Sequence, residues 1–160
     1  MQKVSLDNIG EFVRKVLEQP CFAKATHGDR ATIVVLSGDL GAGKTTFTKG
    51  LARELGVTDV VQSPTYVLMK SYELKRGSTL ERHGVKVEPR FSRLIHIDAY
   101  RLDAPEQFAV LRPETFLHDP HALLVVEWPE RLGKALPIPD LILKFSSDGA
   151  SEGERYITMD

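Results

Sequence analysis

The chain has 160 residues, 42% of them apolar and 27% charged, and its formal net charge is −1. This composition is typical of an ordinary globular protein, and the near-neutral charge argues against binding to nucleic acid or membranes through overall charge. A single cysteine, Cys21, excludes an internal disulfide and fits a reducing compartment. From the length we expect one domain over residues 1–160.

Charged residues interrupt the N-terminal segment, so it does not resemble a secretory signal. Asp7, Glu11, Arg14 and Lys15 stand among its apolar residues, whereas a signal needs an uninterrupted apolar run. No stretch of the chain approaches the roughly 18 apolar residues that a membrane span requires. We therefore expect a cytoplasmic protein with no membrane contact.

The first predicted element is a helix over about residues 9–17, where the apolar residues recur at helical spacing. Ser5 or Asp7 is expected to cap it, and Pro20 to stop it. Residues 19–30 are then expected to form a loop.

A strand, a glycine-rich loop and a second helix follow. Residues 31–37 are apolar and β-branched, as in a fully buried strand. Residues 38–45 hold three glycines, and beyond them apolar residues recur every four positions from Phe47 to Leu55. Gly56 can end this helix.

The second half of the chain predicts further strands, separated by loops and one short helix. Asp103 and Glu106 are expected to cap that helix reciprocally. Alternating strands and helices predict an α/β fold with three layers, similar to P-loop NTPases, in which helices flank a mostly parallel or mixed central sheet. The expected strands are residues 66–72, 94–98, 122–128, 140–145 and 155–159.

Residues 73–93 form a charged insertion, for which a hairpin or an excursion from the sheet is expected. From Lys75 to Arg93 there are six basic residues and two glutamates. A solvated loop is the commoner use of such a segment, and contact with RNA or a protein partner is the alternative.

The glycine-rich loop matches the phosphate-binding motif G-x-x-x-x-G-K-[ST] at every fixed position, with Gly-Asp-Leu-Gly-Ala-Gly-Lys-Thr at residues 38–45. Glycine amides line a concavity for phosphate oxygens, and the following helix directs its positive dipole end to the same place. Lys44 supplies a charge for the β- and γ-phosphates, and the Thr45 hydroxyl is a ligand for Mg²⁺. ATP with Mg²⁺ is the expected ligand.

Two carboxylates at predicted strand ends are candidates for the hydrolytic site, because ligands gather at the carboxyl ends of parallel strands. Glu127 follows a buried run, as a Walker-B acid does, and is expected to hold Mg²⁺ directly or through water. Asp98 is expected to orient water or contact the metal shell. Trp128 can stack on a ligand, although packing is its commoner use, and His96 alone is more typical of a packed strand residue.

Four motifs in series resemble the TsaE family, the YjeE-like P-loop ATPases of bacterial tRNA threonylcarbamoyladenosine biosynthesis. They are Gly-Asp-Leu-Gly-Ala-Gly-Lys-Thr-Thr-Phe at 38–47, Ser-Pro-Thr-Tyr at 63–66, His-x-Asp-x-Tyr-Arg-Leu at 96–102 and Val-Glu-Trp-Pro-Glu at 126–130. The P-loop alone is shared by many NTPases, whereas the series is specific.

The resemblance implies particular roles. Thr45 and Glu127 would hold Mg²⁺, Asp98 would be needed for hydrolysis, Thr65 would sense the nucleotide, and Trp128 would lie beside it. The phosphates of ATP would be wrapped by Gly41, Ala42, Gly43, Lys44, Thr45 and Thr46.

The resemblance also implies partners. The chain would dock on a TsaB–TsaD complex and use ATP hydrolysis to reset it between rounds of modification of adenosine 37 in tRNA. The threonylcarbamoyl transfer itself would belong to TsaD, so contact with tRNA would be indirect or through the complex.

A small-molecule P-loop kinase is the alternative function. Residues 75–93 would then form a basic lid, with Arg82 or Arg90 over the phosphates. This alternative is disfavoured by the Walker-B position, which holds Glu127 followed by Trp128, because most such kinases use aspartate there. Two regions are candidates for the contacts with adenine, the N-terminal helix and the turn at 153–155, and the sequence does not decide between them.

Overall fold

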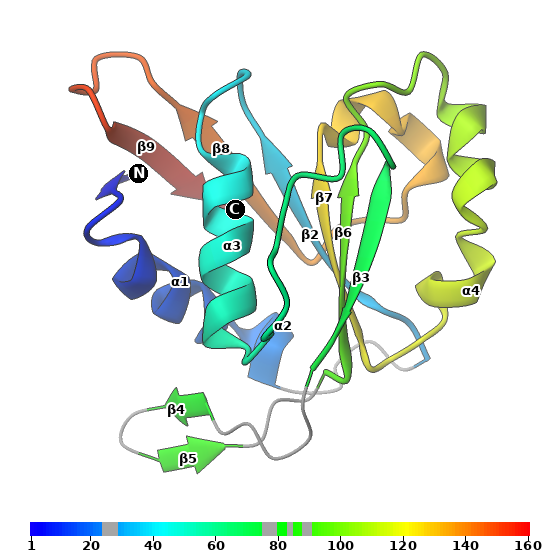
Figure 1. Ribbon diagram of the computed structural model, residues 1–160, viewed down its shortest axis with the longest axis horizontal. Coiled ribbons are helices and arrows are strands. Elements are labelled where there is room, and N and C mark those ends of the chain that lie inside the picture. Colours follow the sequence, from blue (N-terminus) through cyan, green and yellow to red (C-terminus); the bar gives the residue numbers. More distant parts are fainter. Residues whose placement is uncertain (24–28, 75–79, 83–84, 88–90) are drawn as a thin grey trace.

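The computed structural model describes residues 1–23, 29–74, 80–82, 85–87 and 91–160 (Figure 1). Its centre is a seven-stranded sheet in the order β1-β9-β8-β2-β7-β6-β3. The four inner strands β8, β2, β7 and β6 are parallel, and the outer strands β9, β1 and β3 are antiparallel to their neighbours. The strands are β1 Gln2–Ser5, β2 Thr32–Ser37, β3 Met69–Glu73, β6 Arg93–Asp98, β7 Ala122–Glu127, β8 Leu141–Ser146 and β9 Glu154–Met159.

Helices cover both faces of this sheet, which gives the three layers predicted from the sequence. Helices α1 and α3 lie on one face, and the segment that contains α4 lies on the other (Figure 1). The mixed α/β fold is therefore confirmed. The helical elements are α1 Ile9–Leu17, α2 Pro20–Ala23, α3 Lys44–Glu54, α4 Glu114–Leu117 and the 3₁₀ segments η1 Pro105–Leu111, η2 Pro129–Arg131 and η3 Gly133–Ala135.

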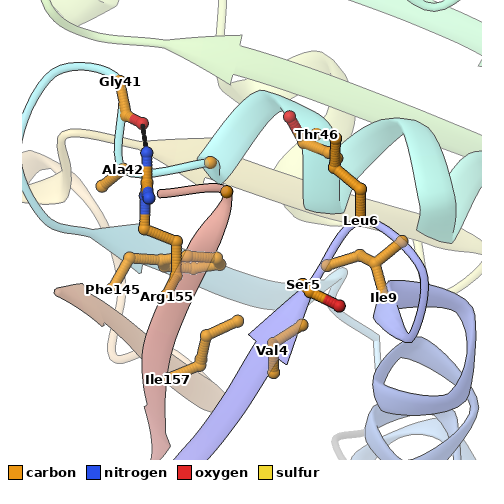
Figure 2. A pocket seen from close by; sticks show the side chains of 12 residues that line it. Val4, Ser5, Leu6, Ile9, Gly41, Ala42, Thr46, Phe145, Arg155 and Ile157 are labelled. Carbon is orange, nitrogen blue, oxygen red and sulfur yellow. Dashed lines mark hydrogen bonds between the residues drawn. The ribbon is translucent and has the colours of Figure 1, made fainter. Parts of the chain in front are cut away.

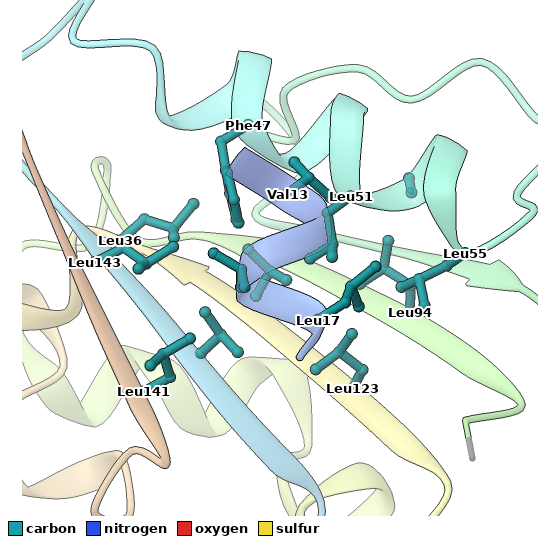
Figure 3. Packing of buried hydrophobic residues seen from close by; sticks show 14 of the residues in the cluster. Val13, Leu17, Leu36, Phe47, Leu51, Leu55, Leu94, Leu123, Leu141 and Leu143 are labelled. Atoms are coloured by element: carbon teal, nitrogen blue, oxygen red, sulfur yellow. The ribbon is translucent and has the colours of Figure 1, made fainter. Parts of the chain in front are cut away.

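Alternation along the strands divides the core into two apolar clusters, one on each face. In β6, Leu94 packs in the α1–α3 cluster, whereas Ile95 and Ile97 pack in the opposite one. Figure 3 shows the first cluster, in which Phe47 and Leu51 of α3 meet the sheet. By the same alternation, His96 and Asp98 point to the face that carries α3.

Two details at the N-terminus differ from the sequence prediction. The helix over 9–17 is present, but Asn8 stands at its N-cap, without a side-chain capping bond, in place of Ser5 or Asp7. The Asn8 side chain instead accepts a hydrogen bond of 2.7 Å from the backbone N–H of Ser5. Residues 20–23, which were expected in a loop, form the short helix α2, and Pro20 opens it because proline is well suited to a first helical position. The first helix ends at Leu17, before Pro20, as expected.

Two further elements have different boundaries or type. Strand β3 begins at Met69, three residues later than expected, because Leu68 adopts a left-handed backbone with φ 63°. The helix after Asp103 is a 3₁₀ segment, and its start is held by Gln107 rather than Glu106. The Gln107 side chain accepts from the backbone N–H of Asp103 at 2.8 Å.

The charged insertion contains an antiparallel hairpin of β4 Leu80–Arg82 and β5 Val85–Val87. The predictions for the rest of residues 75–90, including a lid role for Arg90, lie outside the described residues. Within the part of the chain that the structure describes, no helix is both long enough and apolar enough to cross a membrane.

Candidate nucleotide-binding site

The loop between β2 and α3 requires glycine at two positions that shape it. Gly38 has φ 134°, and a Cβ there would lie 2.3 Å from the carbonyl oxygen of Phe145, so no side chain fits. Gly43 has φ 96° and forms the N-cap of α3. The backbone N–H groups at the start of α3 therefore face the concavity of the loop, as phosphate binding requires.

Lys44 opens α3 and turns its ammonium group back over the loop. Nζ donates hydrogen bonds to the carbonyl oxygens of Gly38 at 2.5 Å and Asp39 at 2.8 Å, and it lies 4.2 Å from the centre of the Trp128 ring. Burial lowers the pKa of Lys44, while nearby carboxylates, led by Glu127, partly offset that shift. The loop thus holds a buried cation where phosphate oxygens would arrive.

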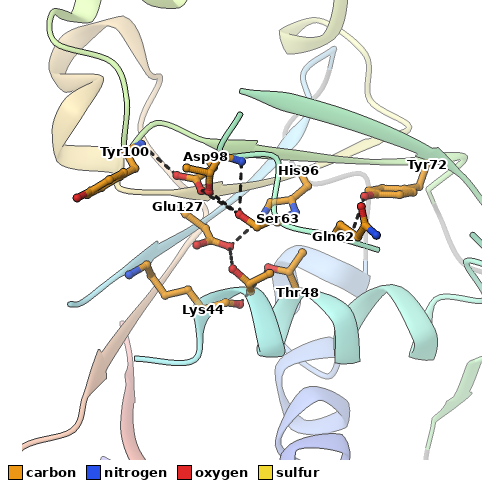
Figure 4. A network of polar contacts seen from close by, with 11 residues as sticks. Lys44, Thr48, Gln62, Ser63, Tyr72, His96, Asp98, Tyr100 and Glu127 are labelled. Carbon is orange, nitrogen blue, oxygen red and sulfur yellow. Dashed lines mark hydrogen bonds and ion pairs between the residues drawn. The ribbon is translucent and has the colours of Figure 1, made fainter. Parts of the chain in front are cut away.

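The two candidate carboxylates are neighbours across the sheet. Asp98 ends β6 and Glu127 ends β7, where they form a register pair, and each is almost completely buried. One oxygen of Glu127, Oε1, accepts hydrogen bonds from the Thr45 hydroxyl at 3.0 Å and from His96 Nε2 at 2.9 Å (Figure 4). Parallel strands of equal register therefore bring both acids to the start of α3.

Asp98 is held by three donors from the two segments beside it. The hydroxyls of Thr65 and Ser63 donate to Oδ2, the latter at 3.2 Å, and the backbone N–H of Tyr100 donates to Oδ1 at 3.0 Å (Figure 4). These bonds fix the carboxylate and connect it to the segment from Ser63 to Thr65.

Trp128 adopts a left-handed backbone with φ 59°, which is uncommon for a bulky residue. Its ring lies 5.1 Å from that of Tyr100 and beneath the ammonium group of Lys44. A strained backbone at a site of this kind is typical of a functional constraint, because it places the side chain where ordinary strand geometry would not.

These side chains line one cavity of about 240 Å³, which we call the carboxylate pocket. Every site residue predicted from the sequence lies in it, although their roles stay predictions. The pocket is lined by Gly41, Ala42, Gly43, Lys44, Thr45, Thr46, Thr65, Asp98, Glu127 and Trp128, together with Leu40, Ser63 and Tyr100.

A second cavity of about 230 Å³, the apolar pocket, lies on the other side of the same loop. Arg155 closes one side of it and donates a hydrogen bond of 3.1 Å to the carbonyl oxygen of Gly41 (Figure 2). Its apolar walls come from β1, the turn after it, α1 and the last two strands, chiefly Val4, Leu6, Ile9, Phe145 and Ile157.

The donor set of the carboxylate pocket fits Mg²⁺ in a nucleotide site. Thr45 and Glu127 offer hard oxygen ligands already within 3.0 Å of each other, and Mg²⁺ prefers oxygen. Among the described residues no group of three or more His, Cys, Asp or Glu side chains could hold a metal alone. Mg²⁺ in nucleotide sites is commonly bound by one or two protein groups, waters and substrate phosphates.

Three residues reach the site through contacts that the sequence did not indicate. His96 contacts Glu127, Ser63 contacts Asp98, and Arg155 contacts Gly41. The motif His96-x-Asp98 was a usable signal for His96, since it places both side chains on one face of β6. Ser63 stood in a quoted motif and Arg155 in the candidate turn at 153–155, but their contacts with Asp98 and Gly41 arise only from the fold.

The phosphate loop follows β2, and the next two strands on one side of it, β7 and β6, each end in an acid. This arrangement defines a P-loop protein of the α/β class. The family model of the threonylcarbamoyl adenosine biosynthesis protein TsaE matches residues 5–157. The chain belongs to this family.

Individual relatives agree with this assignment. The chain is 34% identical over 144 residues to the tRNA threonylcarbamoyladenosine biosynthesis protein TsaE of Bacillus subtilis, covering 90% of this chain and 78% of that one. It is 31% identical to the Haemophilus influenzae protein of the same name, over 73% of this chain and 64% of that one. The crystal structure of Bacillus subtilis YdiB matches 99% of this chain and 82% of its own, with a TM-score of 0.61 and 26% identity.

Proposed function

We propose that this chain is a Mg²⁺-dependent ATPase that serves the threonylcarbamoyl modification of adenosine in tRNA, and that it acts with TsaB and TsaD homologues. Its relatives are named for that biosynthesis. The observation that carries the ATPase proposal is the shared hydrogen bond of Thr45 and Glu127 at the phosphate loop, with Asp98 beside it. Hydrolysis would reset the TsaB–TsaD complex between turnovers.

Each side chain has a separate task in this proposal. Lys44 would exchange its carbonyl partners for the β- and γ-phosphates and offset their charge. Thr45 and Glu127 would hold Mg²⁺, which neutralises charge on the phosphate oxygens when bound. Asp98, already fixed by three donors, would orient the attacking water.

The apolar pocket is where the base of ATP would lie, because it can receive a base while the loop holds the phosphates. It begins at Gly41 and Gly43 on the loop and ends at apolar walls formed by both chain termini. Both candidate regions for adenine, the start of the N-terminal helix and the turn at 153–155, contribute to it. A flat, largely apolar base is buried favourably by such walls.

Reconstitution tests the proposed function directly. The purified chain is combined with TsaB, TsaD, tRNA, ATP and a threonylcarbamoyl donor, and modified tRNA is counted per TsaD molecule. We expect many turnovers with the wild-type chain and about one with the Lys44→Ala variant. Multiple turnovers without this chain would refute the resetting role.

Deletion of residues 75–90 separates the ATPase from the kinase alternative. If the segment is an insertion outside the site, ATP affinity stays within about twofold and tRNA modification or partner affinity alone declines. A loss of ATP binding on deletion would favour a lid, and with it a kinase. Isothermal titration calorimetry with ATP makes the distinction.

A further inference from the structure

His96 does not line the carboxylate pocket but contacts one of its acids, Glu127, and was not predicted to act there. It belongs to β6, its side chain is completely buried, and Nε2 lies 2.9 Å from Oε1 of Glu127 (Figure 4). A carboxylate oxygen can only accept a hydrogen bond, so the proton of this contact sits on Nε2 and the imidazole is the donor.

The other ring nitrogen shows that this contact is what His96 contributes. Nδ1 is buried and has no hydrogen-bond partner among the described residues. A buried polar atom without a partner costs free energy, and an apolar side chain at this place in the core would avoid that cost. The hydrogen bond to Glu127 is the ring's only polar contact among the described residues. This bond therefore explains the presence of a histidine at position 96 better than packing does.

The contact matters because Glu127 has a competing partner nearby. Lys44 is buried in the same pocket, and Glu127 is the carboxylate that most raises its pKa against the effect of burial. The ammonium group nevertheless donates to the carbonyl oxygens of Gly38 and Asp39, not to Glu127. A direct ion pair between Lys44 and Glu127 would leave neither Lys44 available for phosphate nor Glu127 available for the metal.

Two donors from different segments contact the same oxygen of Glu127. Thr45 donates from the start of α3, and His96 donates from the adjacent strand β6. Thr45 is itself the other proposed metal ligand, so its hydroxyl would have to serve Mg²⁺ as well. His96 alone can hold the carboxylate with no second task.

We propose that His96 is a positioning residue, which keeps the Glu127 carboxylate turned toward Thr45 and away from Lys44 so that Mg²⁺ finds a prepared ligand. The proposal rests on the proposed Mg²⁺–nucleotide site. Groups that orient a metal ligand typically change metal affinity by about 10- to 100-fold when removed.

Three variants test this role through metal binding rather than activity. His96→Phe keeps a ring but loses the donor, His96→Met fills the space if the phenyl variant does not fold, and His96→Gln restores an N–H donor at similar reach. Electron paramagnetic resonance of Mn²⁺ measures the affinity of the protein–ADP complex for the metal. Calorimetry with EDTA measures ADP affinity without it.

We expect His96→Phe and His96→Met to lose about tenfold in Mn²⁺ affinity, while metal-free ADP affinity changes by less than about twofold. His96→Gln should recover most of the loss. Unchanged Mn²⁺ affinity in both apolar variants, or equal losses with and without metal, would overturn the proposal. A wild-type protein that binds ADP with no metal dependence would instead refute the Mg²⁺ site itself, and the positioning role with it.

Discussion

The two pockets on either side of the phosphate loop are built from different parts of the chain. The carboxylate pocket gathers Lys44, Asp98 and Glu127 at the ends of inner parallel strands. The apolar pocket is assembled by β1, β8, β9 and the start of α1, at the antiparallel edge of the sheet. Under the proposed function, the carboxylate pocket would carry the chemistry and the apolar pocket would recognise the base, so substitutions on the two sides should affect turnover and nucleotide selectivity differently.

The largest expected effect belongs to Lys44, which lies on the loop between the pockets. Lys44→Ala should weaken ATP binding by about 1,000-fold, because charged hydrogen bonds to phosphate contribute about 1.5–3 kcal/mol each. Calorimetry measures the affinity, and Lys49→Ala, an exposed change of equal charge on the same helix, is the control. Unaltered ATP affinity in Lys44→Ala would contradict the phosphate-loop assignment.

On the carboxylate side, Glu127→Gln should lower Mg²⁺-dependent hydrolysis by about 100-fold while metal-free nucleotide binding is retained. The amide keeps the shape but loses the charge that would hold the metal, and such electrostatic losses cost about 10²–10³ in rate. Phosphate release assays and calorimetry with EDTA separate the two effects. Glu106→Gln, on an exposed glutamate outside both pockets, should leave turnover unchanged. Full turnover in Glu127→Gln would remove Glu127 from the site.

On the apolar side, Leu6→Ala should weaken ADP binding by about fivefold and leave tripolyphosphate binding unchanged. The loss corresponds to about 1 kcal/mol of apolar contact with the base. Val60→Ala, at a similarly exposed apolar residue outside both pockets, serves as the control. An equal loss of affinity for ADP and for tripolyphosphate would show that the apolar pocket does not recognise the base as proposed.

The smallest effect concerns pH. Burial holds the pKa of Lys44 below its ordinary value of 10.5, so between the folded and unfolded pKa values the unfolded state binds more protons. The free energy of unfolding should therefore rise with pH through the window below 10.5. Urea unfolding across that window gives the slope of the free energy of unfolding against pH for the wild type and for Lys44→Met, and the difference in slope measures the contribution of Lys44. Identical slopes would show that the pKa of Lys44 is not shifted.

The carboxylate pocket could be largely anticipated from the sequence, whereas for the apolar pocket the sequence offered only two candidate regions, the N-terminal helix and the turn at 153–155. Lys44, Asp98 and Glu127 stand at fixed places relative to buried strands, and parallel pairing in register dictates that their ends meet. The apolar pocket depends on β1, a strand of four residues with one buried apolar side chain, which gives no periodic signal. Its pairing with β9 joins the two ends of the chain.

Side-chain roles were predictable only where a motif carried them. Glu127 was a candidate because acids that follow buried runs commonly bind metal. His96 was not, because one histidine in a strand resembles any packed residue until its neighbour is known. The capping predictions failed by a single position. Asn8 and Gln107 stand in place of the expected Asp7 and Glu106, and both side chains accept local hydrogen bonds, from the backbone N–H groups of Ser5 and Asp103.

The stacking of Trp128 under the Lys44 ammonium group gives the protein a built-in optical reporter. Trp128 is the only tryptophan in the chain, so all indole fluorescence originates 4.2 Å from the cation that phosphates would attract. Departure of Lys44 from the ring would alter the local field and quenching of that one fluorophore. Emission from the unlabelled protein would then follow loading of the loop in real time, including inside a larger assembly whose other components lack tryptophan.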